Sequence, residues 1–202
     1  MTNDTNDGFR PTRRSVLRLG AMSALGIGIG IPAVSGSVAA TMCPKTPGYW
    51  ANNPDYSSPT DNWAVLGPNG GTNYTLRGVT MTHDDWREFL VAPTKGDKAN
   101  IMAKHYLAIV LNLRNRPGDD PGCTSDDATI QHGDYAGYTI EEVKNMAGAW
   151  LGNSAWSNGG RQKSWYVSVG GDMVDGETLK DTLDAFNNSP GSLGLDCPCN
   201  DR

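Results

Sequence analysis

Histidine is scarce in this chain, which has only three among its 202 residues. His83, His105 and His132 stand far apart, and no His-Glu-x-x-His, Gly-x-Ser-x-Gly or phosphate-loop motif is present. These absences remove the usual sequence signatures of zinc hydrolases, serine hydrolases and nucleotide-binding enzymes. We therefore predict no catalytic residue, no cofactor and no metal, and we interpret His105 as a hydrogen-bonded core residue.

Long hydrophobic runs are also missing. The most apolar stretch, 19–31, spans only about 20 Å as a helix, against roughly 30 Å for the hydrocarbon core of a bilayer. No later segment is long and apolar enough, so we expect no membrane span in the mature chain.

Positive charge is in the minority, with 17 Lys and Arg against 22 Asp and Glu. Residues 1–40 carry four of the Arg and two of the Asp, so their removal changes the net charge from −5 to −7. This acidic balance argues against a nucleic-acid partner.

The N-terminal region has the pattern of a twin-arginine export signal. The pair Arg13-Arg14 precedes the weakly apolar run, and small residues end at Ala40. We predict a signal peptide over 1–40, cleavage between Ala40 and Thr41, and the twin-arginine translocase as a partner during export. The mature chain, a single helical domain over 41–202, is then secreted or held at the cell surface. An uncleaved anchor and lipidation at Cys43 are the alternatives.

All four cysteines lie in the mature part, at Cys43, Cys123, Cys197 and Cys199. An even count in an exported chain indicates two disulfides. A bond from Cys197 to Cys199 would close a very short, strained ring, so we favour separate bonds from Cys43 and Cys123 to the C-terminal pair. A metal site is the alternative, but Cys-x-Cys is not a zinc knuckle and no His stands near it.

Hydrophobic periodicity and capping residues predict four helices. The capping residues Thr82 and Thr139 each precede an acidic residue three positions on, and Asp175 is a third N-cap. The predicted ranges are 84–91, 97–115, 139–151 and 176–186. A short extended piece near 73–79 and a lone strand at 165–169 complete the elements. The predicted fold class is mainly α, a small bundle of about four helices with long, disulfide-stapled loops and at most a short strand pair.

The segment after Cys43 carries a resemblance. The run Thr46-Pro47-Gly48-Tyr49-Trp50-Ala51-Asn52-Asn53-Pro54 resembles the Thr-Pro-Gly-Tyr-Trp-Lys-Asn-His-Pro signature of a family of exported bacterial and archaeal proteins. The similarity continues at 95–98, 102–105, 111–113, 149–151 and 179–188, and so covers most of 43–199. It implies fold and location rather than chemistry. Ala51 and Asn53 replace the family's Lys and His, so a role that depends on those side chains is absent here.

Three functions follow as hypotheses. The leading one is an exported structural or interaction domain without catalysis, whose partner is a protein or polysaccharide outside the cytoplasmic membrane. The second is a carbohydrate-binding surface module that uses Tyr49, Trp50 and Trp63 as a ligand platform. The third is an extracellular hydrolase assembled from separate loops. Burial of Trp50 and Trp63 favours the first, because a sugar platform needs exposed rings.

Two further groups have simpler interpretations. The acidic loop 119–127 with Asp134 lacks the spacing of a calcium-binding EF-hand, so we interpret it as a solvated acidic face. Trp156, Trp165 and Tyr166 form a second aromatic group. We interpret them as core or rim packing, with a partner surface as the alternative.

Overall fold

The computed structural model describes residues 44–53, 63–67, 73–115 and 128–195. Within these ranges the protein is mainly helical, with five α-helices and two antiparallel strand pairs. The predicted export signal, the cleavage site, all four cysteines and the acidic loop 119–127 lie outside the described residues.

The four predicted helices are confirmed, with ends within two residues of the prediction. They are α3 (His83–Val91), α4 (Lys98–Arg114), α5 (Ile140–Asn153) and α6 (Gly176–Asn188). Both capping boxes form. The hydroxyls of Thr82 and Thr139 accept hydrogen bonds from the backbone N–H of Asp85 and Glu142, and the carboxylates of Asp85 and Glu142 accept from the backbone N–H of the two Thr residues. Asp175 caps α6 by accepting from the N–H of Glu177.

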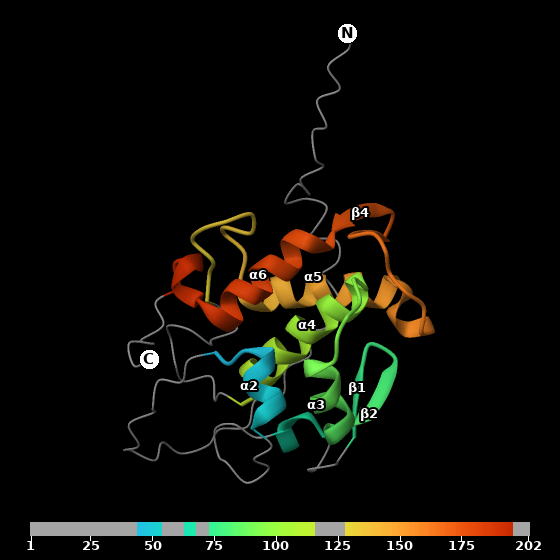
Figure 1. Ribbon diagram of the computed structural model, residues 1–202. Coiled ribbons are helices and arrows are strands. Elements are labelled where there is room, and N and C mark those ends of the chain that lie inside the picture. Colours follow the sequence, from blue (N-terminus) through green and yellow to red (C-terminus); the bar gives the residue numbers. More distant parts are fainter. Residues whose placement is uncertain (1–43, 54–62, 68–72, 116–127, 196–202) are drawn as a thin grey trace, which may run out of the picture.

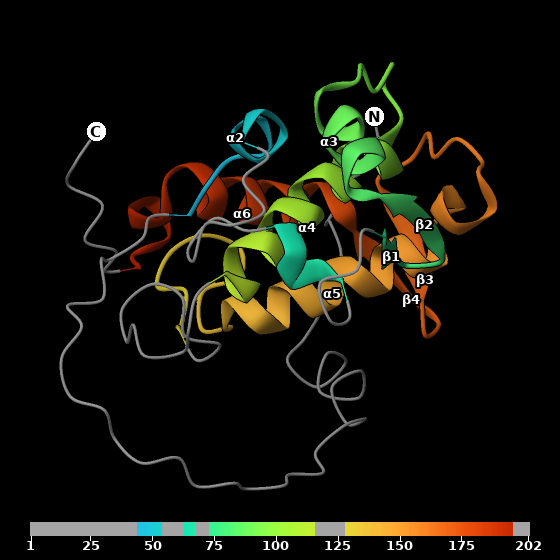
Figure 2. The same cartoon turned by 90° about the horizontal axis from the view of Figure 1, so that it is seen from below.

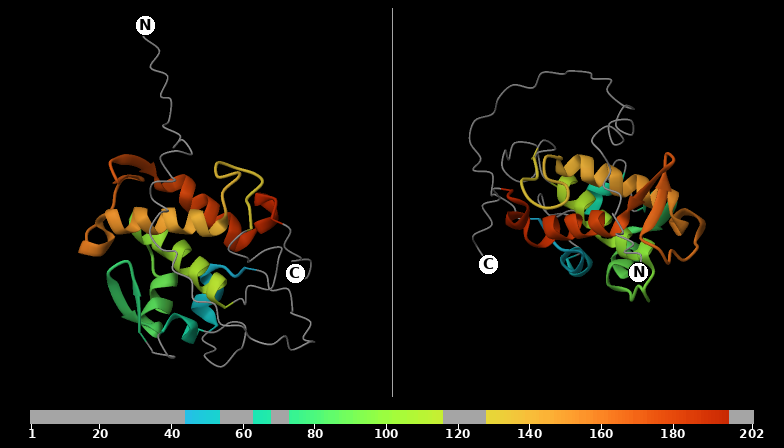
Figure 3. Two further views of the ribbon diagram at one scale, coloured as in Figure 1. Left: turned by 180° about the vertical axis from the view of Figure 1, so that it is seen from behind. Right: turned by 90° about the horizontal axis from the view of Figure 1, so that it is seen from above.

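Helix α4 forms the centre of the molecule. It packs against α5 and α6, which lie side by side on one side of it (Figures 1 and 3). The short helix α2 (Pro47–Asn52) and the 3₁₀ turn η1 (Trp63–Leu66) also contact α4. In the view from below, α4 lies in front of α5 and α6, which are seen to either side of it (Figure 2). Residues Met102 to Leu111 of α4 are mostly buried, as expected for a helix that is apolar on adjacent faces.

The strand content exceeds the prediction of at most one short pair. Strand β1 (Asn73–Leu76) pairs with β2 (Val79–Thr82), and β3 (Tyr166–Val169) pairs with β4 (Asp172–Asp175). Each hairpin turns over two residues that both have positive φ, 47° and 93° at Arg77-Gly78 and 62° and 97° at Gly170-Gly171. Such turns follow the right-handed twist of the flanking strands, so four-residue strands can pair without a longer loop.

Each hairpin runs directly into a helix. Strand β2 ends at Thr82, the N-cap of α3, and β4 ends at Asp175, the N-cap of α6. The chain thus contains the same unit twice, a hairpin with four-residue strands followed by a helix, although its sequence shows no evident repeat. Both hairpins lie toward the same end of the molecule (Figures 1 and 2).

The segment after Cys43, where the sequence analysis predicts no helix, contains a helix of its own. Helix α2 (Pro47–Asn52) begins after Thr46, whose hydroxyl accepts from the N–H of Tyr49. Pro47 occupies the first helical position, where its fixed φ suits the helix and its missing N–H costs nothing. No helix of the described residues is long and apolar enough to cross a membrane.

Candidate functional site

The aromatic residues of the predicted ligand platform lie mostly inside the protein. Trp50 is 1% exposed and Trp63 is 0% exposed, while Tyr49 is half-buried. Tyr49 meets the Trp50 ring edge to face, with 5.7 Å between ring centroids. Lys45 covers the Tyr49 ring with its ammonium group 4.8 Å from the centroid. A sugar cannot stack on Trp50 or Trp63 in this arrangement.

Both indole N–H groups of this cluster have hydrogen-bond acceptors. Trp50 Nε1 donates to Asn112 Oδ1 at 3.2 Å, and Trp63 Nε1 donates to the Trp50 carbonyl at 3.2 Å. Trp63 also packs beside His83, with 5.9 Å between the rings. A buried Trp needs such an acceptor, because an unpaired N–H in the core costs free energy. The 44–53 segment and η1 are therefore joined by the buried hydrogen bond from the Trp63 indole to the Trp50 carbonyl.

Asn112 connects the 44–53 segment to two helices. Its Oδ1 accepts from the N–H of Lys45 at 2.8 Å as well as from Trp50, and its Nδ2 donates to the Lys45 carbonyl at 2.9 Å. Nδ2 also donates to Asn187 Oδ1 of α6 at 2.8 Å. Asn187 in turn donates to the carbonyl of His105 on α4 at 3.2 Å. Both amides are buried, at 1% and 0% exposed, so this network fixes how three segments meet.

The sequence analysis assigned no role to Asn112 or Asn187. Asn112 stands between Leu111 and Leu113 in the most apolar helix of the chain. A polar amide at such a position is a signal in itself, because its burial requires hydrogen-bond partners. The pattern points to a buried network but does not identify the partners, which come from residues far away in the sequence.

A second arrangement lies where α4 meets α6. His105 Nδ1 lies 3.4 Å from Asp184 Oδ1, and the His105 side chain is mostly buried. Burial lowers the pKa of His105 below its ordinary value, and the Asp184 carboxylate opposes that shift. Lys180, Asp181 and Lys104 also act on the imidazole electrostatically. A neutral imidazole beside a carboxylate can accept a proton, so this pair is the arrangement most suited to acid–base chemistry among the residues that the structure describes.

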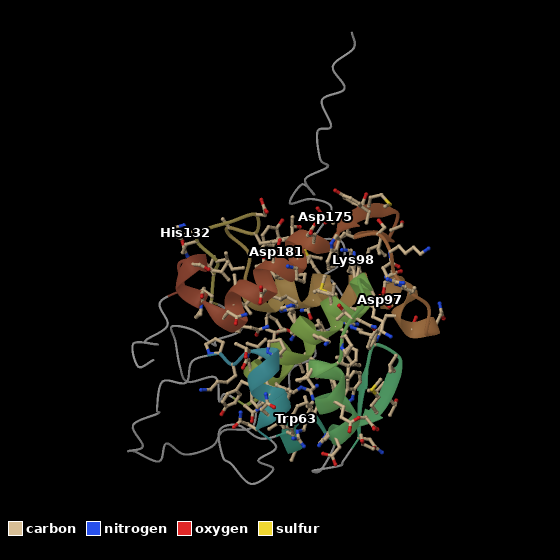
Figure 4. All side chains as sticks on the ribbon, in the orientation of Figure 1. Trp63, Asp97, Lys98, His132, Asp175 and Asp181 are labelled. Carbon is tan, nitrogen blue, oxygen red and sulfur yellow. The ribbon has the colours of Figure 1, made fainter. Side chains whose placement is uncertain are left out.

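The other histidines lie elsewhere. His83 is buried at the start of α3, where burial lowers its pKa, and its neighbour is Trp63. His132 is exposed in the 131–139 loop, and Figure 4 shows it on the opposite side of the molecule from Asp97 and Lys98. The same view places Trp63, the neighbour of His83, well away from Asp181 of α6. Each histidine thus has its own surroundings. In the ranges that the structure covers, no group of three or more His, Cys, Asp or Glu is placed to hold a metal ion.

The second aromatic group divides between core and surface. Trp156 is buried, stacks on Trp86 at 6.2 Å and donates its indole N–H to the Leu76 carbonyl at 3.0 Å. Trp165 packs beside Trp150, with Lys98 Nζ 4.9 Å from its ring centroid. Tyr166, in contrast, is 54% exposed on β3. Two members of this group therefore pack in the core or at its rim, and one faces solvent.

Comparison with known proteins gives no relative. No protein-family model matches the chain, and no curated protein and no solved structure matches it either. The resemblance of 43–199 to a family of exported proteins therefore stays a prediction.

Proposed function

We propose that the mature chain is an exported structural or interaction domain that acts without catalysis, secreted or held at the cell surface. Its partner is a protein or a polysaccharide outside the cytoplasmic membrane. The observation that carries this proposal is the burial of Trp50 and Trp63. Their rings hold the 44–53 segment in the core, and their N–H groups are used within the protein.

The carbohydrate-binding alternative is weakened by the same observation. Stacking on a sugar needs a flat, exposed ring face, and two of the three proposed platform residues offer none. The hydrolase alternative has one observation in its favour, the contact of His105 with Asp184. We place the pair in a structural role because the backbone carbonyl of His105 accepts a hydrogen bond from Asn187. His105 thereby belongs to the buried network of Asn112 and Asn187.

Export is tested by replacing Arg13 and Arg14 with Lys. The planar guanidinium fork cannot be reproduced by an ammonium group, so the variant precursor should stay in the cytoplasm. Mass spectrometry of the exported wild type should place its N-terminus near Thr41. It should also show a mass about 4 Da below that of the reduced protein, as two disulfides require. Unchanged export of the double variant would contradict the proposed route.

Catalysis is tested with the purified exported protein and its His105→Gln variant. Both are assayed against ester, glycoside and peptide substrates and passed over immobilised polysaccharides. We expect no turnover by either protein. Turnover by the wild type that the variant loses would replace our proposal with the hydrolase alternative. Retention on a polysaccharide that Trp50→Phe abolishes would instead favour the carbohydrate-binding module.

A further inference from the structure

The described residues contain two Asn-x-Ser/Thr triplets with no Pro in the middle. They are Asn73-Tyr74-Thr75 at the start of β1 and Asn187-Asn188-Ser189 at the end of α6. This triplet is the acceptor for N-linked glycans on exported proteins, since the transferase needs both the amide and the hydroxyl within reach. The structure places the two triplets in opposite environments.

The first triplet presents both required side chains to solvent. Its middle residue, Tyr74, faces the protein, where its ring lies 6.4 Å from Trp86 and 5.4 Å from the guanidinium of Arg114. Its carbonyl accepts the indole N–H of Trp86 at 2.9 Å. Side chains alternate along a strand, so Asn73 and Thr75 share the other face. Both are exposed.

The second triplet has its reacting amide in the core. Asn187 is 0% exposed, its Nδ2 donates to the His105 carbonyl at 3.2 Å, and its Oδ1 accepts from Asn112 at 2.8 Å. The nitrogen that would carry a glycan is therefore occupied and unreachable in the folded protein. Removing it from the core would break the network that joins α4, α6 and the 44–53 segment.

We propose that Asn73 is an N-glycosylation acceptor of the exported protein and that Asn187 is not. The donor is an oligosaccharide linked through its anomeric carbon to a lipid pyrophosphate or phosphate. Asn73 Nδ2 attacks that carbon and forms the new C–N bond. The C–O bond to the phosphate breaks, and the lipid phosphate leaves with the bonding electrons. One amide proton passes to a base of the transferase, so atoms and charge balance.

The selectivity between the two sites rests on the proposed function, because it requires that the chain is exported already folded. The twin-arginine pathway carries folded proteins, so a transferase outside the membrane meets the native structure. A chain exported unfolded would offer both triplets. Exposure decides between them only in the folded chain.

The glycan would also cover a sheet edge. Strands β1 and β2 form a two-stranded sheet, and Asn73 lies opposite Thr82 in its register. The exposed face also carries Thr75 and Thr80, whose hydroxyls are 2.7 Å apart. A bulky, hydrated glycan at this end would oppose edge-to-edge pairing with another chain.

The test uses the full chain in two settings. In the first, exported protein from the source organism is digested, and the peptides that contain Asn73 and Asn187 are analysed by mass spectrometry. In the second, purified folded protein is incubated with an oligosaccharyltransferase that reads Asn-x-Thr and a lipid-pyrophosphate-linked oligosaccharide. The variants are Asn73→Gln, Thr75→Ala and Thr75→Ser, with Ser189→Ala as the matched control at the buried site. Circular dichroism checks that each variant is folded.

We expect a glycan on the Asn73 peptide in both settings. It should be lost in Asn73→Gln and Thr75→Ala, retained in Thr75→Ser, and unaffected by Ser189→Ala. An unmodified Asn73 peptide in the acceptor assay would overturn the site, whether or not export holds. A glycan on Asn187 of the exported chain would overturn the selectivity. Retention of residues 1–40 in cytoplasmic protein would overturn the proposed export, and the acceptor assay would still decide the site.

Discussion

Truncating Trp50 to Ala tests whether the 44–53 segment stabilises the fold from within. The side chain is 1% exposed, contacts Tyr49 edge to face and donates its N–H to Asn112. The carbonyl of the same residue accepts from Trp63. The substitution would therefore remove one of the largest buried side chains at the junction of α2, η1 and α4.

The expected loss follows from the buried area. A fully buried Trp covers about 150–250 Å², which at about 25 cal/mol per Å² corresponds to about 4–6 kcal/mol as an upper bound. The lost hydrogen bond adds about 1 kcal/mol, and partial collapse of the cavity offsets part of the total. We expect Trp50→Ala to lower the free energy of unfolding by about 3–5 kcal/mol. With a urea dependence of about 2 kcal/mol per M, the unfolding midpoint falls by roughly 2 M.

Two control variants separate the causes. Trp50→Phe keeps a buried ring but removes the indole N–H, and Asn112 Oδ1 still accepts from Lys45, so a smaller loss of about 1–2 kcal/mol is expected. Tyr166→Ala truncates an aromatic ring that is 54% exposed, so its effect should stay within about 0.5 kcal/mol. Urea unfolding followed by tryptophan fluorescence and circular dichroism measures all three. Equal midpoints for the wild type and Trp50→Ala would refute the reasoning.

Two further predictions concern packing and pH. A Cβ at Gly176 would lie 2.4 Å from Cε2 of Trp150, so Gly176→Ala should lower the free energy of unfolding by about 1–3 kcal/mol. A Cβ at Gly152 would have no atom within 4 Å, so Gly152→Ala should be neutral or stabilise α5 by up to about 1 kcal/mol. Shifts of the two urea midpoints in the same direction would contradict this prediction. Burial lowers the pKa of His105 from its ordinary value of 6.5, although the Asp184 carboxylate opposes this shift. The unfolded chain therefore binds a proton more readily than the folded chain, and stability should fall as pH drops below about 6.5. Melting temperatures at about pH 8 and pH 5.5 should differ less in His105→Gln than in the wild type, and an unchanged difference would count against the assignment.

The four longer helices could be predicted because their signals are local. Thr82 and Asp85, like Thr139 and Glu142, lie within one helical turn of each other. Their capping boxes therefore use hydrogen bonds between residues that are close in the sequence. The apolar stripe of α4 likewise repeats at helical spacing. Such signals locate a helix and its ends, but they do not determine which other helix it contacts.

The predicted extended segments near 73–79 and at 165–169 coincide with β1 and β3, but their pairing partners and helix α2 were missed for different reasons. The turn at Gly170-Gly171 carries a recognisable two-glycine signal, which together with the predicted strand before it would have predicted β4 as the second strand of a hairpin. At Arg77-Gly78 the first turn residue is not a glycine, and the positive φ of Arg77 is uncommon for its type. Helix α2 has only six residues, too few for a periodic pattern, so its signal was limited to Thr46 and Pro47.

The candidate site depends on contacts that no local pattern contains. Asn112 bonds to Lys45 and to Asn187, which are 67 and 75 residues away in the sequence. The network is complete only when α4, α6 and the 44–53 segment are in place together, since each amide left unpaired in the core costs about 1–3 kcal/mol. Docking of the 44–53 segment should therefore be coupled to the packing of the helices rather than follow it as a separate step. This coupling explains why the 44–53 segment, whose aromatic residues could also be interpreted as a surface ligand platform, is part of the core.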